Sequence, residues 1–295
     1  MRIRLLAAAC VVAAVAVIAG PADAVLGGQP DGNAHPYVGY EDNGVFSCSG
    51  TLLSPTVMLT AAHCFSTSTS AFGTDTATGA PLVRVSFDPN LINTPAAQRV
   101  WHFGTYYFDP NFVNGAHGLP HFDSHDVALI IFGSPGCVVP ANASGIKSCG
   151  PVASPGGFGA LPTEGLVDTL ANHTPIDLVG YGVQNFIIGG GPCGGPCKPA
   201  QGSAFTRFFG QTTLVTSNDR ISDEFLKLQS NPSGTCFGDS GGPNLIGGTN
   251  IVLGVNSFVA NSICSGNTYS YRADTEQALS WITATAVAEG GSLSH

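Results

Sequence analysis

Three short segments carry residue types that together can perform nucleophilic catalysis. Ser240 lies between glycines and directly after an acidic residue, His63 precedes a cysteine, and Asp126 opens an apolar run. A serine hydroxyl stays protonated at neutral pH, so it needs a base that takes its proton during attack. An imidazole can be that base, and a buried carboxylate can hold the imidazole in the required tautomer. The segments therefore predict that Ser240 is a nucleophile, His63 its general base and Asp126 the residue that orients His63.

Each segment also has an interpretation without catalysis. His63 could be a packed core histidine, Asp126 a turn cap, and Ser240 part of a tight glycine turn. The occurrence of all three in the order His, Asp, Ser makes coincidence the weaker explanation.

Nucleophilic attack on a carbonyl group also requires a site for the developing negative charge. Preorganised N–H groups stabilise such an oxyanion. The amides of Gly238 and Ser240 flank Asp239 and are the candidate donors. Glycine at position 238 leaves room for close approach of a substrate.

The elements that must position these residues are short strands. Gly- and Pro-containing turns separate β-like runs, whose spacing predicts a sandwich or barrel; the runs are Val57–Thr60, Leu82–Val85, Val127–Phe132, Ile176–Tyr181 and Ile251–Phe258. The Gly/Pro-rich stretch 133–165 is interpreted as the connection between two halves. A helix is expected near the end of the chain, capped by Asp274 with Gln277 three residues later and ended by Gly290-Gly291.

Residues 1–24 have the pattern of a secretory signal. Arg2 and Arg4 precede the apolar run Leu5–Ile18, and Ala22-Asp23-Ala24 fits a cleavage site. A transmembrane anchor is the alternative, but the run is shorter than the ~20 residues that a span needs. We therefore expect a secreted, extracellular protein without a membrane contact after the signal is removed.

The cysteine count suits an oxidising compartment. With Cys10 inside the signal, eight of the nine cysteines remain, which favours four disulfides of open connectivity. A zinc site at Cys193 and Cys197 is the alternative, but no second C-x-x-C pair accompanies them. The formal net charge of −9 argues against a nucleic-acid partner.

With its motifs, the mature chain resembles the trypsin/chymotrypsin-type serine proteases from Val25 to about Trp281. The resemblance rests on Thr60-Ala61-Ala62-His63-Cys64, on Asp126-Val127-Ala128-Leu129-Ile130, and on Gly238-Asp239-Ser240-Gly241-Gly242-Pro243. It implies an all-β fold of two packed six-stranded antiparallel β-barrels with a C-terminal helix. The expected domains are the signal at 1–24, an N-terminal barrel at 25–145, and a C-terminal barrel with the helix at 146–295.

The resemblance also assigns roles to individual residues. His63, Asp126 and Ser240 match the catalytic triad, and Gly238 and Ser240 match the oxyanion hole. Cys48 with Cys64, and Cys236 with Cys264, match disulfides of the family. The remaining cysteines are then paired locally, as Cys137 with Cys149 and Cys193 with Cys197.

The family normally frees an α-amino group that pairs with the Asp before the nucleophile. Val25-Leu26-Gly27-Gly28 resembles the mature start, but Ala24 precedes it instead of Arg or Lys. We therefore expect signal cleavage itself to create the Val25 amine that pairs with Asp239. A cut nearby followed by trimming is the alternative.

The resemblance places Gly234 at the base of the primary specificity pocket. An Asp there would select Arg or Lys, and glycine cannot. The walls are expected from Ser257, Phe258, Val259 and Tyr269, with side chains at 259 and 269 filling the slot. Small apolar P1 residues are the expected preference. Ser257 is also expected to hydrogen-bond Asp126.

The function that follows is a secreted serine endopeptidase that works through an acyl-enzyme. A catalytically inactive, protease-like binding protein is the alternative, and an esterase is a weaker third interpretation. A polypeptide substrate and protein protease inhibitors are the expected partners of a monomer. No cofactor or metal is expected. A metal role of His117, His121 and His125 would need a helix, which Gly118 and Pro120 disfavour.

Overall fold

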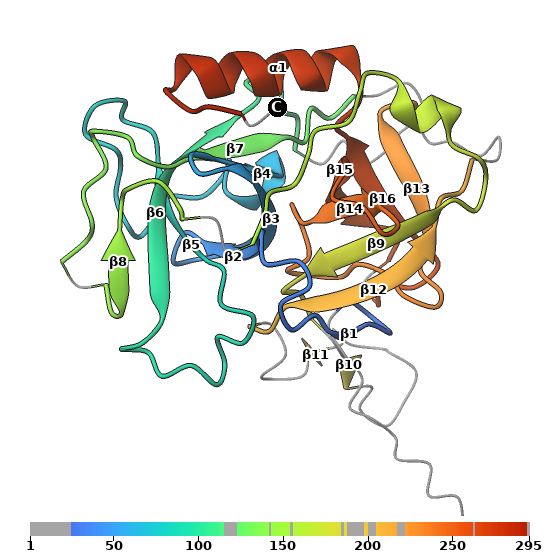
Figure 1. Cartoon of the computed structure of the whole chain (residues 1–295), viewed down its shortest axis with the longest axis horizontal. Helices are drawn as coiled ribbons and strands as arrows, with labels where there is room; N and C mark the ends of the chain where they lie inside the picture. The colour runs from blue at the N-terminus through green and yellow to red at the C-terminus, as the bar shows by residue number, and fades with distance from the viewer. Residues whose placement is uncertain are drawn as a thin grey trace, which may run out of the picture.

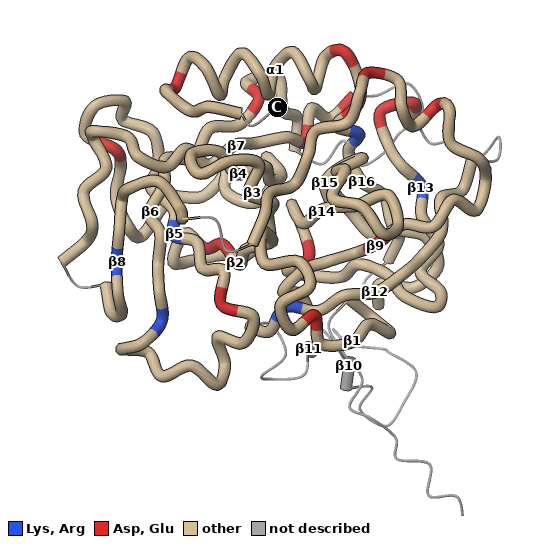
Figure 2. Tube along the Cα trace, in the orientation of Figure 1, with Lys and Arg blue, Asp and Glu red and all other residues tan. Residues whose placement is uncertain are grey.

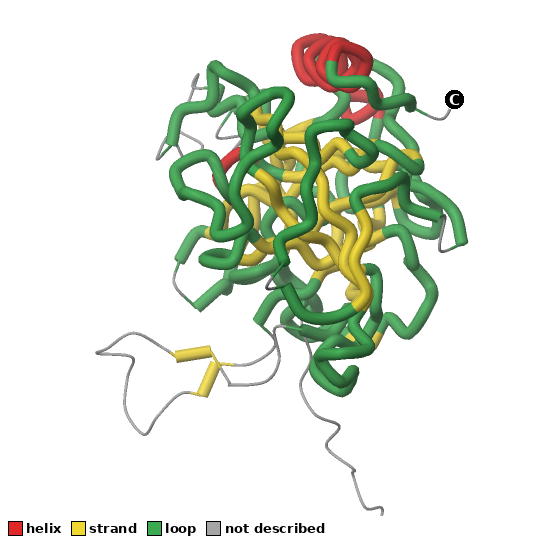
Figure 3. The backbone as a smooth tube through the Cα atoms, turned by 90° about the vertical axis from the view of Figure 1, so that its left-hand side faces the viewer, coloured by secondary structure: helices red, strands yellow, loops and turns green. Residues whose placement is uncertain are grey.

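The computed structural model describes residues 25–114, 123–141, 143–153, 156–183, 186–187, 198–199, 205–216, 222–261 and 263–293. Two β-sheets lie side by side, and the C-terminal helix lies along one edge of the molecule (Figure 1). Loops surround the strands on the outside (Figure 3). No helix in these ranges has the length and apolarity that a membrane crossing requires.

The first sheet closes into a barrel. Its strands are β2 (Val38–Asp42), β3 (Ser47–Ser54), β4 (Val57–Thr60), β5 (Leu82–Ser86), β6 (Val100–Phe108), β7 (Ala128–Ile131) and β8 (Ile146–Ser148). They pair in the order β5-β2-β3-β4-β7-β6-β8, and a further pairing of β5 with β6 closes six of them. The short β8 runs parallel to β6 outside this ring.

The second sheet repeats this plan. Its strands are β1 (Gln29–Pro30), β9 (Pro175–Gly180), β12 (Phe208–Thr213), β13 (Phe225–Gln229), β14 (Pro243–Ile246), β15 (Val252–Val259) and β16 (Asn267–Arg272). The order is β1-β12-β9-β14-β15-β16-β13. A bridge between Leu214, just after β12, and Leu228 of β13 joins the two ends of the six main strands.

Four shorter elements lie outside the two main sheets. Two 3₁₀ helices, η1 and η2, span Ala62–Cys64 and Leu166–Thr169. The strands β10 (Phe186–Ile187) and β11 (Lys198–Pro199) pair only with each other.

The predicted fold class is confirmed: two barrel-like antiparallel sheets and a C-terminal helix, α1 (Glu276–Ala288). Two details differ from a clean division at residue 146. Strand β8 lies beyond that boundary but pairs with the first barrel, and β1 lies near the start of the chain but pairs with β12 of the second. Each half of the sequence therefore contributes one short strand to the barrel that is formed mainly by the other half.

The N-cap of helix α1 lies one residue later in the chain than predicted. The Thr275 hydroxyl accepts a hydrogen bond from the Ala278 amide, so Thr275 and not Asp274 is the N-cap. Asp274 is buried and instead accepts hydrogen bonds from Arg272 and from the Val167 amide. The prediction failed because the sequence does not show that Arg272 competes for this carboxylate.

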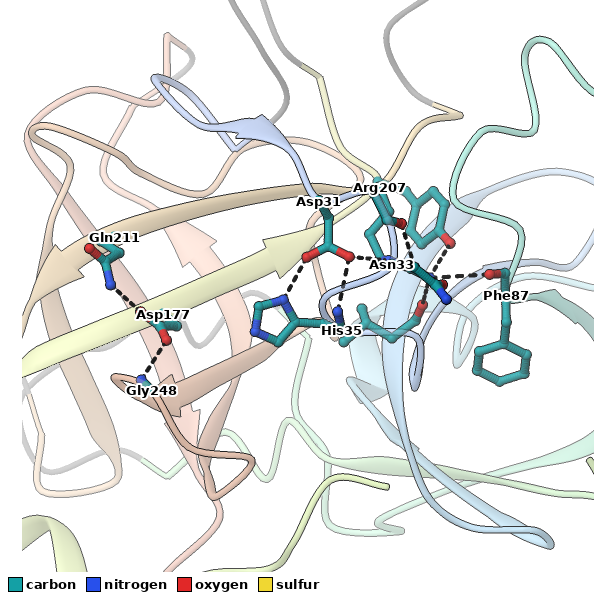
Figure 4. Close-up of polar contacts among 11 residues, drawn as sticks. Asp31, Asn33, His35, Phe87, Asp177, Arg207, Gln211 and Gly248 are labelled. Carbon is teal, nitrogen blue, oxygen red and sulfur yellow. Dashed lines mark hydrogen bonds and ion pairs between the residues drawn. The ribbon is translucent and has the colours of Figure 1, made fainter. Parts of the chain in front are cut away.

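A buried arginine ties the N-terminal segment to both barrels (Figure 4). Arg207 directly precedes β12, and its side chain, like that of its ion-pair partner Asp31, is fully buried, with 2.8 Å between Arg207 Nε and Asp31 Oδ2. The guanidinium also donates to the carbonyls of Gly32, Val38 and Phe87. Its hydrogen bonds therefore reach the N-terminal segment and the first barrel at once.

Candidate active site

The loop that carries Ser240 is fixed against the first barrel. The Ser49 amide donates to the Ser240 carbonyl at 2.8 Å, and the Ser49 hydroxyl donates to the Gly238 carbonyl at 2.8 Å. Gly238 and Gly241 have φ of +94° and +74°, which favours glycine at both positions. A Cβ atom at Gly241 would also lie 2.1 Å from Thr60 Oγ1. The glycines therefore allow the loop to turn in contact with the opposite barrel.

His63 lies in η1, immediately after β4. The Tyr106 hydroxyl donates to the carbonyls of Ala61 and Ala62 at 2.9 and 2.8 Å. A disulfide joins the neighbouring Cys64 to Cys48 of β3. The backbone on the N-terminal side of His63 and the residue that follows it are thus both held by the barrel.

Asp126 lies just before β7 and contacts His63 twice. The distance from His63 Nδ1 to Asp126 Oδ2 is 2.8 Å, and the His63 amide donates to Asp126 Oδ1 at 2.9 Å. The Ser257 hydroxyl, from β15 of the other barrel, donates to Asp126 Oδ2. The carboxylate is only 2% exposed, so these contacts replace its water.

The pKa values of this pair move apart. Burial by itself raises the pKa of Asp126, but the His63 charge and the hydrogen bonds from His63 and Ser257 lower it below 3.8 overall. Burial by itself lowers the pKa of His63, but the Asp126 charge and hydrogen bond raise it above 6.5 overall. The carboxylate therefore stays ionised and makes the imidazole a stronger base.

Ser240 and His63 border one cavity of about 870 Å³. Among the described residues, the Ser240 hydroxyl has no hydrogen-bond partner, whereas its backbone carbonyl does. Hydrogen bonds to a catalytic base are often long before substrate binds. Ser240 is also partly exposed, so its hydroxyl is accessible to a ligand in the cavity.

Most of the predicted pocket residues border the same cavity. Ser257, Phe258, Val259 and Tyr269 line it, and the Phe258 and Tyr269 rings stack with centroids 4.7 Å apart. Gly234 is not among its lining residues, and a Cβ there would meet Ser230 Cβ at 2.7 Å.

Further residues that were not predicted from the sequence also line the cavity, among them Phe46, Thr235, Phe237 and Asn256. Phe237 directly precedes the recognised Gly238-Asp239-Ser240 segment, so its position there was a usable signal. Asn256 stands out as an amide in an otherwise apolar strand. Phe46 reaches the cavity from the β2–β3 turn, which no local pattern indicates.

Asp239 is a fully buried carboxylate whose partners are backbone amides. It accepts hydrogen bonds from Gly182 and Cys236, both at 2.9 Å, and no Lys, Arg or His of the described residues forms an ion pair with it. Burial raises its pKa to about 7, although the two amides act in the opposite direction. Val25 is also fully buried, and Leu26 bridges to Gly234.

Three of the expected disulfides are present: Cys48–Cys64, Cys137–Cys149 and Cys236–Cys264. Cys193, Cys197, His117 and His121 lie outside the described residues. His125 contacts Asp109 at 3.2 Å. Cys48, His63 and Cys64 are close enough to suggest a metal group, but the disulfide leaves them no thiolate.

Comparison with known proteins agrees with this architecture. The family model described as Trypsin matches residues 166–282, which include Ser240. A solved structure titled HL collagenase has a TM-score of 0.57 at 17% identity, covering 88% of this chain and 97% of its own. Mouse neuropsin, a serine protease expressed in the limbic system of the brain, has a TM-score of 0.56 at 18% identity, covering 88% and 98%.

No curated protein sequence matches the chain. At such low identities the two structures show the shared fold, whereas the family match concerns the sequence itself. The family model marks residues 166–282 as similar to the trypsin family, and the two structures show that the chain shares their chymotrypsin-like fold.

Proposed function

We propose that the protein is a secreted endopeptidase in which Ser240, His63 and Asp126 form the catalytic triad. The observation that carries the proposal is the 2.8 Å contact between His63 Nδ1 and Asp126 Oδ2 at the wall of the cavity that Ser240 borders. With Nδ1 occupied by Asp126, the other ring nitrogen of His63 is the one left to accept a proton. The signal-like residues 1–24 and the disulfides support secretion.

In this mechanism, Ser240 Oγ attacks the peptide carbonyl carbon while His63 takes the hydroxyl proton. The amides of Gly238 and Ser240 donate to the resulting oxyanion. His63 then gives its proton to the leaving amine, which leaves an acyl-enzyme that water hydrolyses by the same steps. Asp126 stays ionised throughout and stabilises the imidazolium.

The substrate pocket supports a preference for small apolar P1 residues. Charged residues are sparse along the chain (Figure 2), and none of the described residues that line the cavity is Asp, Glu, Lys or Arg. Val259 and the stacked Phe258 and Tyr269 rings instead present apolar surface. A basic P1 side chain would therefore bind there without a counter-charge.

We expect peptide amides with Ala or Val at P1 to have kcat/KM values at least about a hundredfold above those with Arg or Lys. An unpaired buried charge costs several kcal/mol, and about 3 kcal/mol corresponds to this factor. Steady-state kinetics on a matched set of chromogenic peptides measures the ratio. Faster turnover of the Arg peptide would show that a charge outside the described lining selects P1.

Activation is proposed to depend on a free amine at Val25. Asp239 precedes the nucleophile and has no cationic partner among the described side chains, while Val25 is buried at the start of the described chain. Cleavage after Ala24 would supply an α-ammonium group to this carboxylate. Signal cleavage would then complete the active site without a separate zymogen step.

The deciding experiment is mass spectrometry of the secreted protein after reaction with a small fluorophosphonate. Stoichiometric labelling at Ser240, absent in Ser240→Ala, is expected on a chain that begins at Val25. An unlabelled chain that begins at Val25 would support the inactive binding protein. An unlabelled chain with a longer start would instead indicate a precursor and contradict the proposed route of activation.

A further inference from the structure

Strand β15 of the second barrel contains a buried amide side chain, that of Asn256. Asn256 interrupts the run Val-Leu-Gly-Val-Asn-Ser-Phe-Val of β15 and is 3% exposed. An amide at such a position costs free energy unless its polar atoms are hydrogen-bonded. Its bonds therefore indicate what it contributes.

Asn256 is bonded three times to the loop that carries Ser240. Its side-chain Nδ2 donates to the Asp239 carbonyl at 2.9 Å. Its backbone amide donates to the Gly242 carbonyl at 2.9 Å, and its carbonyl accepts from the Gly241 amide at 2.8 Å. Any residue at position 256 could form the two backbone hydrogen bonds. The hydrogen bond to the Asp239 carbonyl, in contrast, requires a side chain with a donor at the position of the Asn256 Nδ2 atom.

Two further buried residues fix the orientation of the Asn256 amide. Asn244 Nδ2 donates to Asn256 Oδ1 at 2.7 Å, and the Ser270 hydroxyl lies 2.9 Å from Asn244 Oδ1 and 3.3 Å from Asn256 Oδ1. Because its oxygen is occupied by these donors, Asn256 must present its NH₂ group to the Asp239 carbonyl. We call Asn244, Asn256 and Ser270 the amide cluster.

The carbonyl of Asp239 and the amide of Ser240 belong to the same peptide unit. A trans peptide is planar, so the direction of its C=O group fixes the opposite direction of its N–H group. A hydrogen bond to the carbonyl also polarises the unit and strengthens the N–H as a donor. Asn256 therefore acts on the amide that would donate to the oxyanion.

We propose that Asn256 is a positioning residue that aims the Ser240 N–H at the oxyanion through the Asp239 carbonyl. This inference rests on the proposed function, since it presumes that Ser240 is the nucleophile. The next residue of the strand, Ser257, contacts a different part of the proposed site, since its hydroxyl donates to the Asp126 carboxylate. The strand pairing of β15 with β16 shifts register between Asn256 and Phe258, and this irregularity lets consecutive residues face different partners.

The test separates positioning from stability. In the triple variant Asn244→Leu/Asn256→Leu/Ser270→Ala, the whole amide cluster becomes apolar, so no amide is left unpaired and the fold is expected to persist. Thr51→Val is the control, since Thr51 is a fully buried residue of β3 whose hydroxyl has no hydrogen-bond partner among the described residues. Asn256→Thr, whose hydroxyl is too short to reach the carbonyl, is a milder second variant.

We expect kcat to fall by roughly tenfold to a hundredfold in both cluster variants. This fall is smaller than the loss expected when an oxyanion donor is removed altogether, because the Ser240 amide remains present but is less well oriented. KM on an alanine P1 peptide amide should change by less than about twofold, because the peptide ground state carries no oxyanion. A peptide trifluoromethyl ketone, which forms an oxyanion on the enzyme, should bind more weakly by the same factor as kcat. The control should match the wild type.

Folded cluster variants with wild-type kcat and ketone affinity would overturn the positioning role. A fall in kcat with unchanged ketone affinity would also overturn it, since the loss would then not concern the groups that bind the oxyanion. Absence of fluorophosphonate labelling in the wild type would overturn the proposed function itself. Circular dichroism of each variant establishes that it is folded, and Asn256→Thr decides the question if the triple variant does not fold.

Discussion

Replacing Ser240 with alanine is expected to lower kcat by about five to six orders of magnitude, with KM little changed. The methyl group cannot attack the carbonyl, although the pocket and the amides that surround it remain. His63→Ala should cost about as much, and the double variant should be no worse than either alone, because the two residues act as one unit. This non-additivity is the signature of a working triad.

The measurement is steady-state hydrolysis of an alanine P1 peptide amide by the purified mature protein. Ser66→Ala is a matched control, since Ser66 follows His63 by three residues and its buried hydroxyl has no hydrogen-bond partner in the described part of the chain. It should leave kcat unchanged within about twofold. Retention of most of the activity in Ser240→Ala would show that a different group, or a different protein in the preparation, cleaves the peptide.

An uncleaved junction before Val25 is expected to lower the free energy of unfolding by about 4 kcal/mol at pH 7.5. In the uncleaved chain the pKa of Asp239 is raised from 3.8 to about 7. The folded state therefore holds this proton more tightly than the unfolded state, and stability is lost as pH rises between these two values. At about 1.4 kcal/mol per pKa unit, about 3 kcal/mol of the loss develops above pH 5.

A chain that begins at Val25 should not show this loss, since its α-ammonium group compensates the ionised Asp239. Urea unfolding at pH 5 and pH 7.5 compares it with a chain that begins at Ala24, both as Ser240→Ala to prevent self-cleavage. We expect the gap between the two chains to widen with pH. Identical pH dependence would show that the amine does not reach Asp239.

The residues of the proposed triad could be predicted because each one lies in a short, self-contained pattern. His63 and Ser240 are flanked by small residues that allow tight turns, and Asp126 lies two residues before a strand whose apolar residues are contiguous in sequence. Strands such as Val57–Thr60 were predicted at their observed bounds for the same reason. Local composition determines these features, so they are visible before the chain folds.

What the sequence did not reveal depends on partners that are distant along the chain. Asp274 was expected to cap a helix, but Arg272 and the Val167 amide bind it instead. Asn256 has no visible role until β14 and β16 bring Asn244 and Ser270 against it. The surroundings of Gly234 were likewise unpredictable, since Ser230 lies against it only in the folded chain.

Arg207 has a consequence for the cooperativity of folding. Its guanidinium donates to the carbonyls of Val38 and Phe87 in the first barrel, so separation of the barrels would break these two charge-assisted hydrogen bonds. Hydrogen bonds to a charged group typically contribute about 1.5–3 kcal/mol each. Neither barrel can therefore open far without the other. The cleft that they share, with His63 on one side and Ser240 on the other, is accordingly a preorganised receptor with little freedom to widen or narrow.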